Sequence, residues 1–196
     1  MTNEVELVVL ADENGKPAGT APKATIHTSH TPLHFAFSNY LLDEHGRLLM
    51  TRRALDKQAW PGVWTNSFCG HPGPGESFVA AIHRRATEEL GFAPEAIRDV
   101  QTILPDFQYR AEDSSGIVEW EICPVHVSRL ATGHRPDPVP AEIDSIDWVE
   151  PAELFAAVDA APFAFSPWLV EQLSHPELRQ ALTDLVDEEL PAEEEF

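Results

Sequence analysis

The chain has 196 residues, the size of one ordinary domain, so two independent cores are not expected. Hydrophobic residues make up 43% of the chain and charged residues 23%, a globular composition that excludes wholesale disorder. A formal charge of -20 would repel nucleic acid and anionic membranes, so neither is an expected partner. No apolar run approaches the roughly 20 residues that a membrane-spanning helix needs.

Cysteine use points to a reducing compartment. The two cysteines, Cys69 and Cys123, lie far apart, and the chain opens with the acidic stretch Met-Thr-Asn-Glu-Val-Glu rather than a secretory leader. We therefore expect reduced thiols and a cytoplasmic protein. Cys123 lies in a predicted strand, where a small buried apolar residue is its simplest interpretation.

Strands dominate the first third of the chain. Apolar runs bounded by turn residues predict strands at residues 5–10, 33–42 and 48–52. A turn, Asn14-Gly15-Lys16-Pro17, follows the first of them. The other two flank Asp43-Glu44-His45-Gly46 and therefore predict a β-hairpin.

The clearest helical pattern runs from Glu76 to Leu90. Its apolar residues recur at helical spacing: Phe78, Val79, Ile82, Ala86 and Leu90. Gly91 stands where a C-cap glycine belongs, because a helix commonly ends on a residue in the left-handed conformation. The segment therefore predicts an amphipathic helix that ends at Leu90.

The second half of the chain mixes strands and helices. Two β-rich stretches, 100–110 and 116–130, flank the turn-like 113–116 and predict an antiparallel pair. Prolines and glycines predict a loop at 131–140, and 145–150 predicts another strand. Three prolines stand at plausible first positions of helices: Pro151, Pro167 and Pro176.

Two regions of the sequence differ in charge from the rest. Residues 187–196 hold six carboxylates, so we expect a solvated acidic tail after a single domain at 1–186. Residues 47–110 hold eight basic and seven acidic side chains, a charge of +1 against -21 for the remainder. Salt bridges to the acidic remainder would explain this block. A compact anionic ligand would explain it too, because it needs several cations close together.

The predicted helix carries a motif with fixed spacing. Glycine, five residues, glutamate, seven residues, arginine, and then Glu-Glu-x-Gly-apolar are supplied by Gly70, Glu76, Arg84, Glu88, Glu89, Gly91 and Phe92. This spacing resembles the Nudix box, where carboxylates on one helical face hold Mg2+ against a diphosphate. An ordinary surface helix with i,i+4 ion pairs would explain any one residue, but seven matches favour the motif.

One position departs from the pattern of Nudix hydrolases. Arg85 stands where those enzymes carry a glutamate that helps to hold metal and assists the attack of water. An arginine can grip a diphosphate, but it serves neither as a metal ligand nor as a general base. We therefore expect diphosphate binding to be kept, whereas hydrolysis is put in doubt.

The segments around the box resemble the metal-dependent, type I isopentenyl diphosphate isomerases. The resemblance covers about residues 5 to 175 and is carried by His27-Thr28 through Leu33-His34, Thr51-Arg52-Arg53-Ala54-Leu55, Trp60 through Ser67, Cys69-Gly70-His71-Pro72, Tyr109-Arg110-Ala111, Glu119-Trp120-Glu121 and Ser166-Pro167-Trp168. It implies an α+β fold, an α/β/α sandwich whose Nudix-like mixed sheet is flanked by helices. It also implies interconversion of isopentenyl diphosphate and dimethylallyl diphosphate, without an organic cofactor.

The resemblance implies that Cys69 and Glu121 are the two proton-transfer groups, one on each face of the alkene, in an order left open. Tyr109 would assist Glu121 through its hydroxyl. Trp168 would place a π-face near the cationic carbon, with core packing as the alternative. An unactivated alkene is a weak base, so this chemistry needs a positioned acid in a dry pocket. Strand alternation puts Glu119 on the same face as Glu121.

The resemblance also implies two metal sites. One would be formed by three imidazoles and two carboxylates, which suit Mn2+, Zn2+ or Fe2+, with Mg2+ possible: His27, His34, His71, Glu119 and Glu121. His30 would replace His27 if that residue is misplaced. The other site would hold Mg2+ shared with the diphosphate, through Glu89 and Cys69. Surface or hydrogen-bonded positions are expected for His30, His45, His83, His126, His134 and His175.

Further cations complete the implied substrate site. Diphosphate oxygens would be held by Lys23, Arg53, Lys57 and Arg85. Solvated positions are expected for Arg52 and Arg84, and core or lid positions for Trp60, Trp64, Trp120 and Trp148.

Two other functions stay open at this point. A Nudix diphosphohydrolase would release phosphate, although Arg85 and the surplus histidines fit it poorly. A metal-stabilised binding protein would keep the pocket without turnover, and would not need two opposed proton donors. Whichever holds, we expect a small-molecule ligand and a monomer or weak homo-oligomer.

Overall fold

The computed structural model describes residues 5–187. Its strands are β1 (Leu7–Ala11), β2 (Pro17–Pro22), β3 (His34–Phe35), β4 (Phe37–Leu42), β5 (Leu48–Arg53), β6 (Trp64–Thr65), β7 (Phe68–Gly70), β8 (Ile97–Leu104), β9 (Gln108–Glu112), β10 (Val118–Ile122), β11 (Val125–Leu130) and β12 (Ile143–Val149). Its helices are α1 (Lys23–Ile26), α2 (Phe78–Leu90), α3 (Pro151–Ala160), the 3-10 turn η1 (Pro162–Ala164), α4 (Pro167–Leu173) and α5 (Pro176–Asp187).

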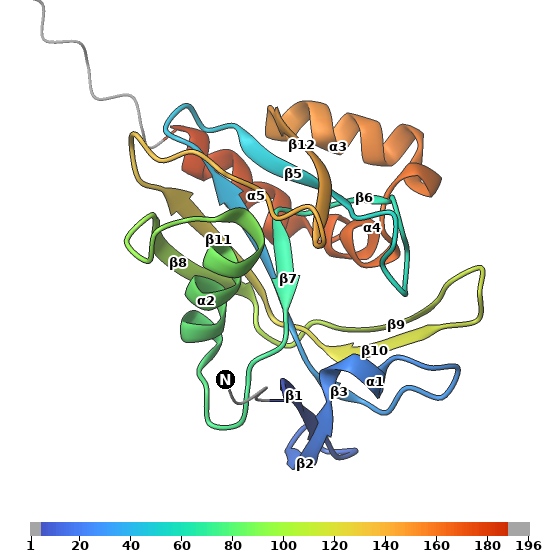
Figure 1. Ribbon diagram of the computed structural model, residues 1–196. Helices are drawn as coiled ribbons and strands as arrows, with labels where there is room; N and C mark the ends of the chain where they lie inside the picture. Colours follow the sequence, from blue (N-terminus) through green and yellow to red (C-terminus); the bar gives the residue numbers. More distant parts are fainter. Residues whose placement is uncertain (1–4, 188–196) are drawn as a thin grey trace, which may run out of the picture.

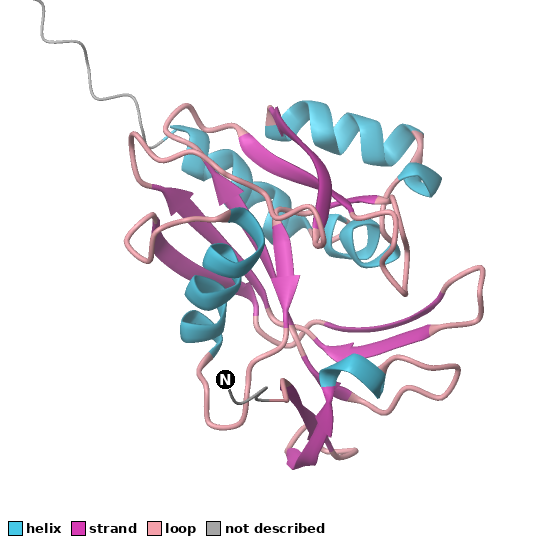
Figure 2. Ribbon diagram, viewed as in Figure 1, coloured by secondary structure: helices cyan, strands magenta, loops and turns pink. Residues whose placement is uncertain are grey.

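The strands form two sheets (Figure 1). The smaller sheet has the order β2-β1-β3-β10-β9, and the larger has the order β12-β5-β4-β11-β8, with β6 beside β5 and β7 beside β4. Figure 2 shows helices on both faces of the larger sheet, whereas the smaller sheet carries only the short α1. The predicted α/β/α sandwich with a mixed sheet is confirmed.

The strand predicted at 33–42 is divided between the two sheets. His34 in β3 pairs with β10, whereas β4, from Phe37 onward, pairs in parallel with β11. The predicted hairpin is present but short, because β4 and β5 are antiparallel neighbours that share the single register pair Leu42 and Leu48. A turn does join them, but β5 pairs mainly with β12.

The β-rich stretches predicted later in the chain divide at the same junction. Pro105 follows β8 and Pro124 precedes β11, and a proline cannot donate to a ladder. The predicted antiparallel pairing is confirmed, but twice over, as β9 with β10 and as β8 with β11. Three chain segments therefore pass from one sheet to the other, which places the ends of several strands at one junction.

Helix α2 forms where it was predicted. The Ser77 side chain accepts a hydrogen bond from the Ala80 amide at 3.2 Å, and Gly91 ends the helix with φ 66°. Gly70 lets α2 approach β7, because a Cβ at this position would lie 2.7 Å from the Cγ of Arg85. The first glycine of the box is thus a contact point between strand and helix.

The core lies on both faces of β4, whose residues are all buried. Tyr40 and Leu42 belong to one apolar cluster, which includes buried leucines of α4 and α5. Phe37 and Leu41 belong to the other, which includes Ile82 of α2. Alternation along a strand buried between two helical layers produces this division.

The remaining predictions concern the second half of the chain. Helices begin at Pro151, Pro167 and Pro176, as predicted, and no helix or strand lies at 131–140. Of the predicted tail, Asp187 ends α5, and residues 188–196 lie outside the described residues. Between residues 5 and 187 no helix is long and apolar enough to cross a membrane.

Candidate active site

A cavity of about 590 Å³ lies at the junction of the two sheets. It is lined by residues of α1, α2 and α4, of β7, β9 and β10, and of the loop after β5. Of the thirteen residues predicted for the site, twelve line this cavity: Lys23, His27, Arg53, Lys57, Cys69, His71, Arg85, Glu89, Tyr109, Glu119, Glu121 and Trp168. The thirteenth, His34, is fully buried and contacts Glu121 and His71.

Four of these residues form what we call the histidine cluster: His27, His34, His71 and Glu121. One possible ligand atom from each lies within 4.8 Å of the others. The Glu121 Oε1 atom is 3.1 Å from His71 Nε2, 3.3 Å from His34 Nε2 and 3.9 Å from His27 Nε2. His30 is exposed and takes no part in the cluster, so its pairing with His34 was not needed.

The protonation of the histidine cluster suits a metal cation. The His34 Nδ1 atom lies 2.9 Å from the Pro32 carbonyl oxygen, to which it donates, so the lone pair of its Nε2 faces the cluster. That Nε2 is 3.2 Å from His71 Nε2, and the buried His27 Nε2 has no hydrogen-bond partner. Imidazole nitrogens converging on a carboxylate oxygen form a donor set for a borderline divalent ion.

The pKa values of His71 and Glu121 are both lowered, for different reasons. Burial lowers the pKa of His71 to about 4, so its ring is neutral near pH 7 and able to coordinate. Burial also opposes ionisation of Glu121, but its contacts with the three histidines outweigh burial and hold its pKa well below the usual range. Burial opposes protonation of His34, but the nearby Glu121 outweighs it and raises the pKa of His34, so the ring shown to be neutral beside the ionised Glu121 is that of His71.

Tyr109 joins the two carboxylates of β10. Its hydroxyl lies 2.7 Å from Glu119 Oε2 and 2.8 Å from Glu121 Oε2. Burial and the nearby Glu121 raise the pKa of Glu119, which lies outside the histidine cluster. Both glutamates line the cavity, whereas Trp120 between them does not, as strand alternation predicts.

Cys69 lines the cavity from β7. Its Sγ atom lies 3.3 Å from Asn66 Oδ1 and 3.4 Å from Ser38 Oγ, and the Gln172 amide donates to that Ser38 oxygen at 2.8 Å. Burial raises the pKa of Cys69 to about 12, so the thiol keeps its proton near pH 7. Sequence reasoning assigned no role to Ser38 and Gln172, because neither polar residue lies in a recognised motif.

Trp168 packs in the core, as one of its two expected roles requires, and it also borders the cavity. Its side chain is 1% exposed. Its Nε1 donates to Asn66 Oδ1 at 3.2 Å, the same oxygen that contacts Cys69. The Arg53 guanidinium lies 5.4 Å from the ring centroid, so the indole already carries a cation on its π-face.

Three of the predicted diphosphate ligands are engaged by carboxylates, and we call this group the basic cluster: Lys23, Lys57 and Arg85, with Glu6, Glu89 and Glu142. Lys23 Nζ is 2.8 Å from Glu6 Oε1, and Lys57 contacts Glu142 directly. Arg85 contacts Glu89 and lies 3.5 Å from Glu142 Oε2. The i,i+4 pair of Arg85 with Glu89 is thus present.

Arg84 corrects an expectation. We expected a solvated charge, but its guanidinium is 2.9 Å from both oxygens of Glu76, 3.1 Å from Glu88 and 3.0 Å from the His71 carbonyl. These contacts fix the loop of the box to α2 and hold the backbone of a histidine-cluster residue. Arg52 likewise pairs with Asp144, at 3.1 Å.

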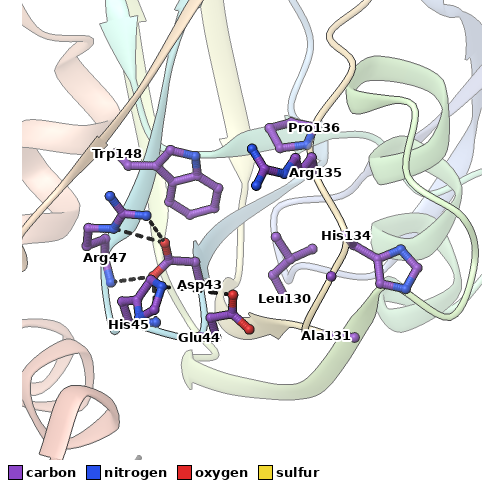
Figure 3. Close-up of a pocket in the computed structure, with 11 residues that line it drawn as sticks. Asp43, Glu44, His45, Arg47, Leu130, Ala131, His134, Arg135, Pro136 and Trp148 are labelled. Carbon is purple, nitrogen blue, oxygen red and sulfur yellow. Dashed lines mark hydrogen bonds and ion pairs between the residues drawn. The ribbon is translucent and has the colours of Figure 1, made fainter.

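A second hollow, of about 220 Å³, lies beside the turn after β4 (Figure 3). Arg47 pairs there with Asp43 at 2.7 Å, and its guanidinium lies 6.0 Å from the Trp148 ring centroid. None of the predicted site residues lines it. The larger cavity is therefore the candidate active site.

A family model and solved structures identify the class of the fold. The model of the NUDIX domain matches residues 32–169. A crystal structure of a Deinococcus radiodurans protein aligns with a TM-score of 0.65 at 20% identity, over 86% of this chain and 98% of that one. The MutT protein of Methanosarcina mazei aligns with a TM-score of 0.53 at 17% identity, over 82% and 97%. The fold and the box together define a Nudix protein.

Sequence relatives narrow the class. A Corynebacterium glutamicum protein named isopentenyl-diphosphate Delta-isomerase is 63% identical over 96% of this chain and its own full length. Proteins of the same name from Corynebacterium diphtheriae and Kocuria rhizophila are 58% and 54% identical, over 92% and 90% of this chain. The chain belongs to this family of the Nudix superfamily.

Proposed function

We propose that this protein is an isopentenyl-diphosphate Delta-isomerase, which interconverts isopentenyl diphosphate and dimethylallyl diphosphate by moving a proton on and off the alkene. The observation that carries the proposal is that Cys69 and Glu121 line one cavity together with the cations predicted for a diphosphate. Relatives that bear the name span nearly the whole chain. The free thiols support a cytoplasmic location.

The proposed chemistry uses two groups in opposite protonation states. Moving a double bond by one carbon requires one group that gives a proton and another that takes one from the neighbouring carbon. The thiol of Cys69 carries a proton and the carboxyl group of Glu121 does not, as their pKa shifts indicate. The Tyr109 hydroxyl, bonded to Glu121, would stabilise the carboxylate whenever it is ionised.

The cavity walls suit a cationic intermediate. Trp168 and Tyr109 are both buried, with ring centroids 5.8 Å apart, so aromatic surface excludes water from this part of the cavity. Water would otherwise capture a tertiary carbocation before the second proton transfer. The indole face adds attraction for positive charge.

The converging ligand atoms of the histidine cluster fit one divalent ion, and the proposal adds a second beside the diphosphate. His27, His34, His71, Glu119 and Glu121 would hold Mn2+, Zn2+ or Mg2+, and Glu89 and Cys69 would hold Mg2+ with the diphosphate. A metal at the first site would orient Glu121 and adjust its acidity. Lys23, Arg53, Lys57 and Arg85 would bind diphosphate oxygens.

Incubation with isopentenyl diphosphate in D2O tests the proposal. An isomerase incorporates deuterium into recovered substrate and into dimethylallyl diphosphate, which mass spectrometry detects. Release of phosphate without exchange would indicate a Nudix hydrolase instead, although Arg85 occupies the position of the hydrolase glutamate. Binding without exchange, with any divalent ion, would indicate a binding protein.

A further inference from the structure

The lining of the main cavity carries more negative charge than a diphosphate pocket needs. It contains four cations, those predicted to hold the diphosphate, and five carboxylates, so its formal charge is -1. Two of the carboxylates, Glu6 and Glu142, belong to no recognised motif. The net field of such a lining does not attract a polyanion that arrives alone.

Glu142 forms ion pairs with two of the four cations. Its Oε2 atom contacts Lys57 Nζ directly and lies 3.5 Å from Arg85 Nη2. Its side chain is 26% exposed and lines the cavity. A diphosphate that binds Lys57 and Arg85 must therefore replace this carboxylate or share its partners.

Glu142 stays ionised in this position. Burial favours its neutral form, but Lys57 and then Arg85 and Lys23 outweigh burial and lower its pKa below the ordinary value. A second polyanion placed among these cations would therefore meet a fixed negative charge. Like charges brought together in a partly desolvated site repel each other and weaken binding.

The backbone of Glu142 is held, so the side chain alone can respond. Its amide donates to the Val139 carbonyl at 2.9 Å, and its carbonyl accepts from the Ala54 amide at 3.1 Å. The carboxylate can leave Lys57 and Arg85 by rotating about its side-chain bonds, without movement of the loop. The ion pairs are thus an exchangeable contact on a fixed frame.

We propose that Glu142 is a specificity-determining residue that makes diphosphate binding conditional on a divalent cation. While the cavity is empty it holds Lys57 and Arg85, and it repels a diphosphate that carries no metal. A divalent ion that enters with the diphosphate offsets the negative lining and offers the carboxylate another partner, which frees both cations. The inference rests on the proposed function for the identity of the anion.

Calorimetric titration with inorganic diphosphate tests this role without catalysis. Full-length protein is titrated in buffer without divalent ions and again in buffer with Mg2+. For the unmodified protein we expect Mg2+ to strengthen binding at least about tenfold. For Glu142→Gln, which keeps the shape but removes the charge, metal-free diphosphate should bind about tenfold more tightly, so the gain from Mg2+ shrinks.

Two further variants make the test specific. Asp144→Asn is the matched control, because Asp144 follows on the same segment but pairs with Arg52 at 3.1 Å and does not line the cavity. It should leave both affinities unchanged. Glu6→Gln frees Lys23 and should act in the same direction as Glu142→Gln, but less, because the Glu6 side chain is 47% exposed.

Three results would overturn the role of Glu142. Glu142→Gln could change both affinities equally, change neither, or weaken only the binding of magnesium diphosphate. Each would mean that the carboxylate does not discriminate between the two forms of the anion. If deuterium exchange nevertheless occurs, the proposed function stands and this inference alone fails. If unmodified protein binds diphosphate in neither buffer and shows no deuterium exchange, both are contradicted.

Discussion

The histidine cluster and the basic cluster share one cavity but are organised differently. In the histidine cluster the ligand atoms lie within 4.8 Å of one another and meet at one oxygen of Glu121. In the basic cluster each cation is already engaged by a carboxylate. The first is preorganised for a cation, whereas the second must exchange internal partners before it receives an anion.

The largest expected effect concerns the two proton-transfer groups, Cys69 and the Glu121 of the histidine cluster, which both line the shared cavity. Cys69→Ala and Glu121→Gln should each lower turnover by at least about 10³-fold, because a positioned proton donor or acceptor is lost. Binding of magnesium diphosphate should survive, since the basic cluster is intact. Deuterium exchange and calorimetry measure the two quantities separately.

Cys123→Ala is the control for the thiol. Cys123 also contacts Ser38, at 3.5 Å, but it does not line the cavity. It should retain most of the activity. Substantial turnover by Cys69→Ala would break the proposed mechanism.

Metal removal tests whether the histidine cluster is preorganised for a cation. A chelator should abolish activity and lower the melting temperature by about 5 to 10 °C, because a ligand held at 100 times its dissociation constant stabilises by about 2.7 kcal/mol. Returning Mn2+, Zn2+ or Mg2+ separately should restore both to different extents. Scanning calorimetry and exchange assays follow the recovery.

His34→Ala sharpens the same test. It removes a fully buried member of the histidine cluster, so its melting temperature should respond little to added metal. A variant whose response to metal equals that of the unmodified protein would show that the ions bind elsewhere.

Arg85→Glu tests whether the basic cluster binds the diphosphate. It places a like charge beside Glu88 and Glu89 and should raise the Michaelis constant for isopentenyl diphosphate by about tenfold or more. Phosphate release should be assayed in parallel, because the variant restores the glutamate of the hydrolase pattern. Arg85→Lys keeps the charge and controls for folding. An unchanged Michaelis constant would make the arginine purely structural.

The smallest expected effect concerns the pH dependence of the free energy of unfolding. It tests whether the loss of stability in acid arises from a histidine in the core or from the histidine cluster. Burial lowers the pKa of His126, which packs between Phe37 and Phe78 and does not line the cavity. The unfolded chain takes up a proton near pH 6.5 while the folded chain does not, so the free energy of unfolding falls as the pH falls below that value.

His126→Gln should flatten this dependence, by at most about 1.4 kcal/mol per pH unit. Urea denaturation between pH 7 and pH 5 measures it. His45→Gln, at an exposed imidazole, is the control and should leave the slope unchanged. If His126→Gln also leaves it unchanged, the loss of stability in acid arises elsewhere, with the histidine cluster the next candidate.

Local patterns predicted the parts of the molecule that depend on local spacing. The helix up to Gly91 and the shared face of Glu119 and Glu121 follow from periods of 3.6 and 2 residues. The break at Ala36, between β3 and β4, could not be predicted in this way. Its cause is that β10 and β11, about ninety residues later, pair with the two halves in different sheets.

The site was predictable where residues fall in a motif and not where they act through tertiary contact. Twelve residues that line the cavity could be predicted, because they lie in the box or in the flanking segments that resemble a known family. Glu142 and Gln172 are single polar residues in ordinary surroundings, and only the fold brings them to Lys57 and to Ser38. Their contacts join segments that lie far apart in the sequence, so the spacing of residues does not reveal them.

The contacts around Cys69 set an order of events during synthesis. Asn66, which bonds the thiol, is also bonded by Trp168, and Ser38 is bonded by Gln172. A ribosome must therefore release more than four-fifths of the polypeptide before the pocket around this sulfur closes. A nascent chain stalled before residue 166 would lack the contacts of Trp168 and Gln172, so its thiol should react faster with alkylating reagents than the half-buried thiol of the finished protein.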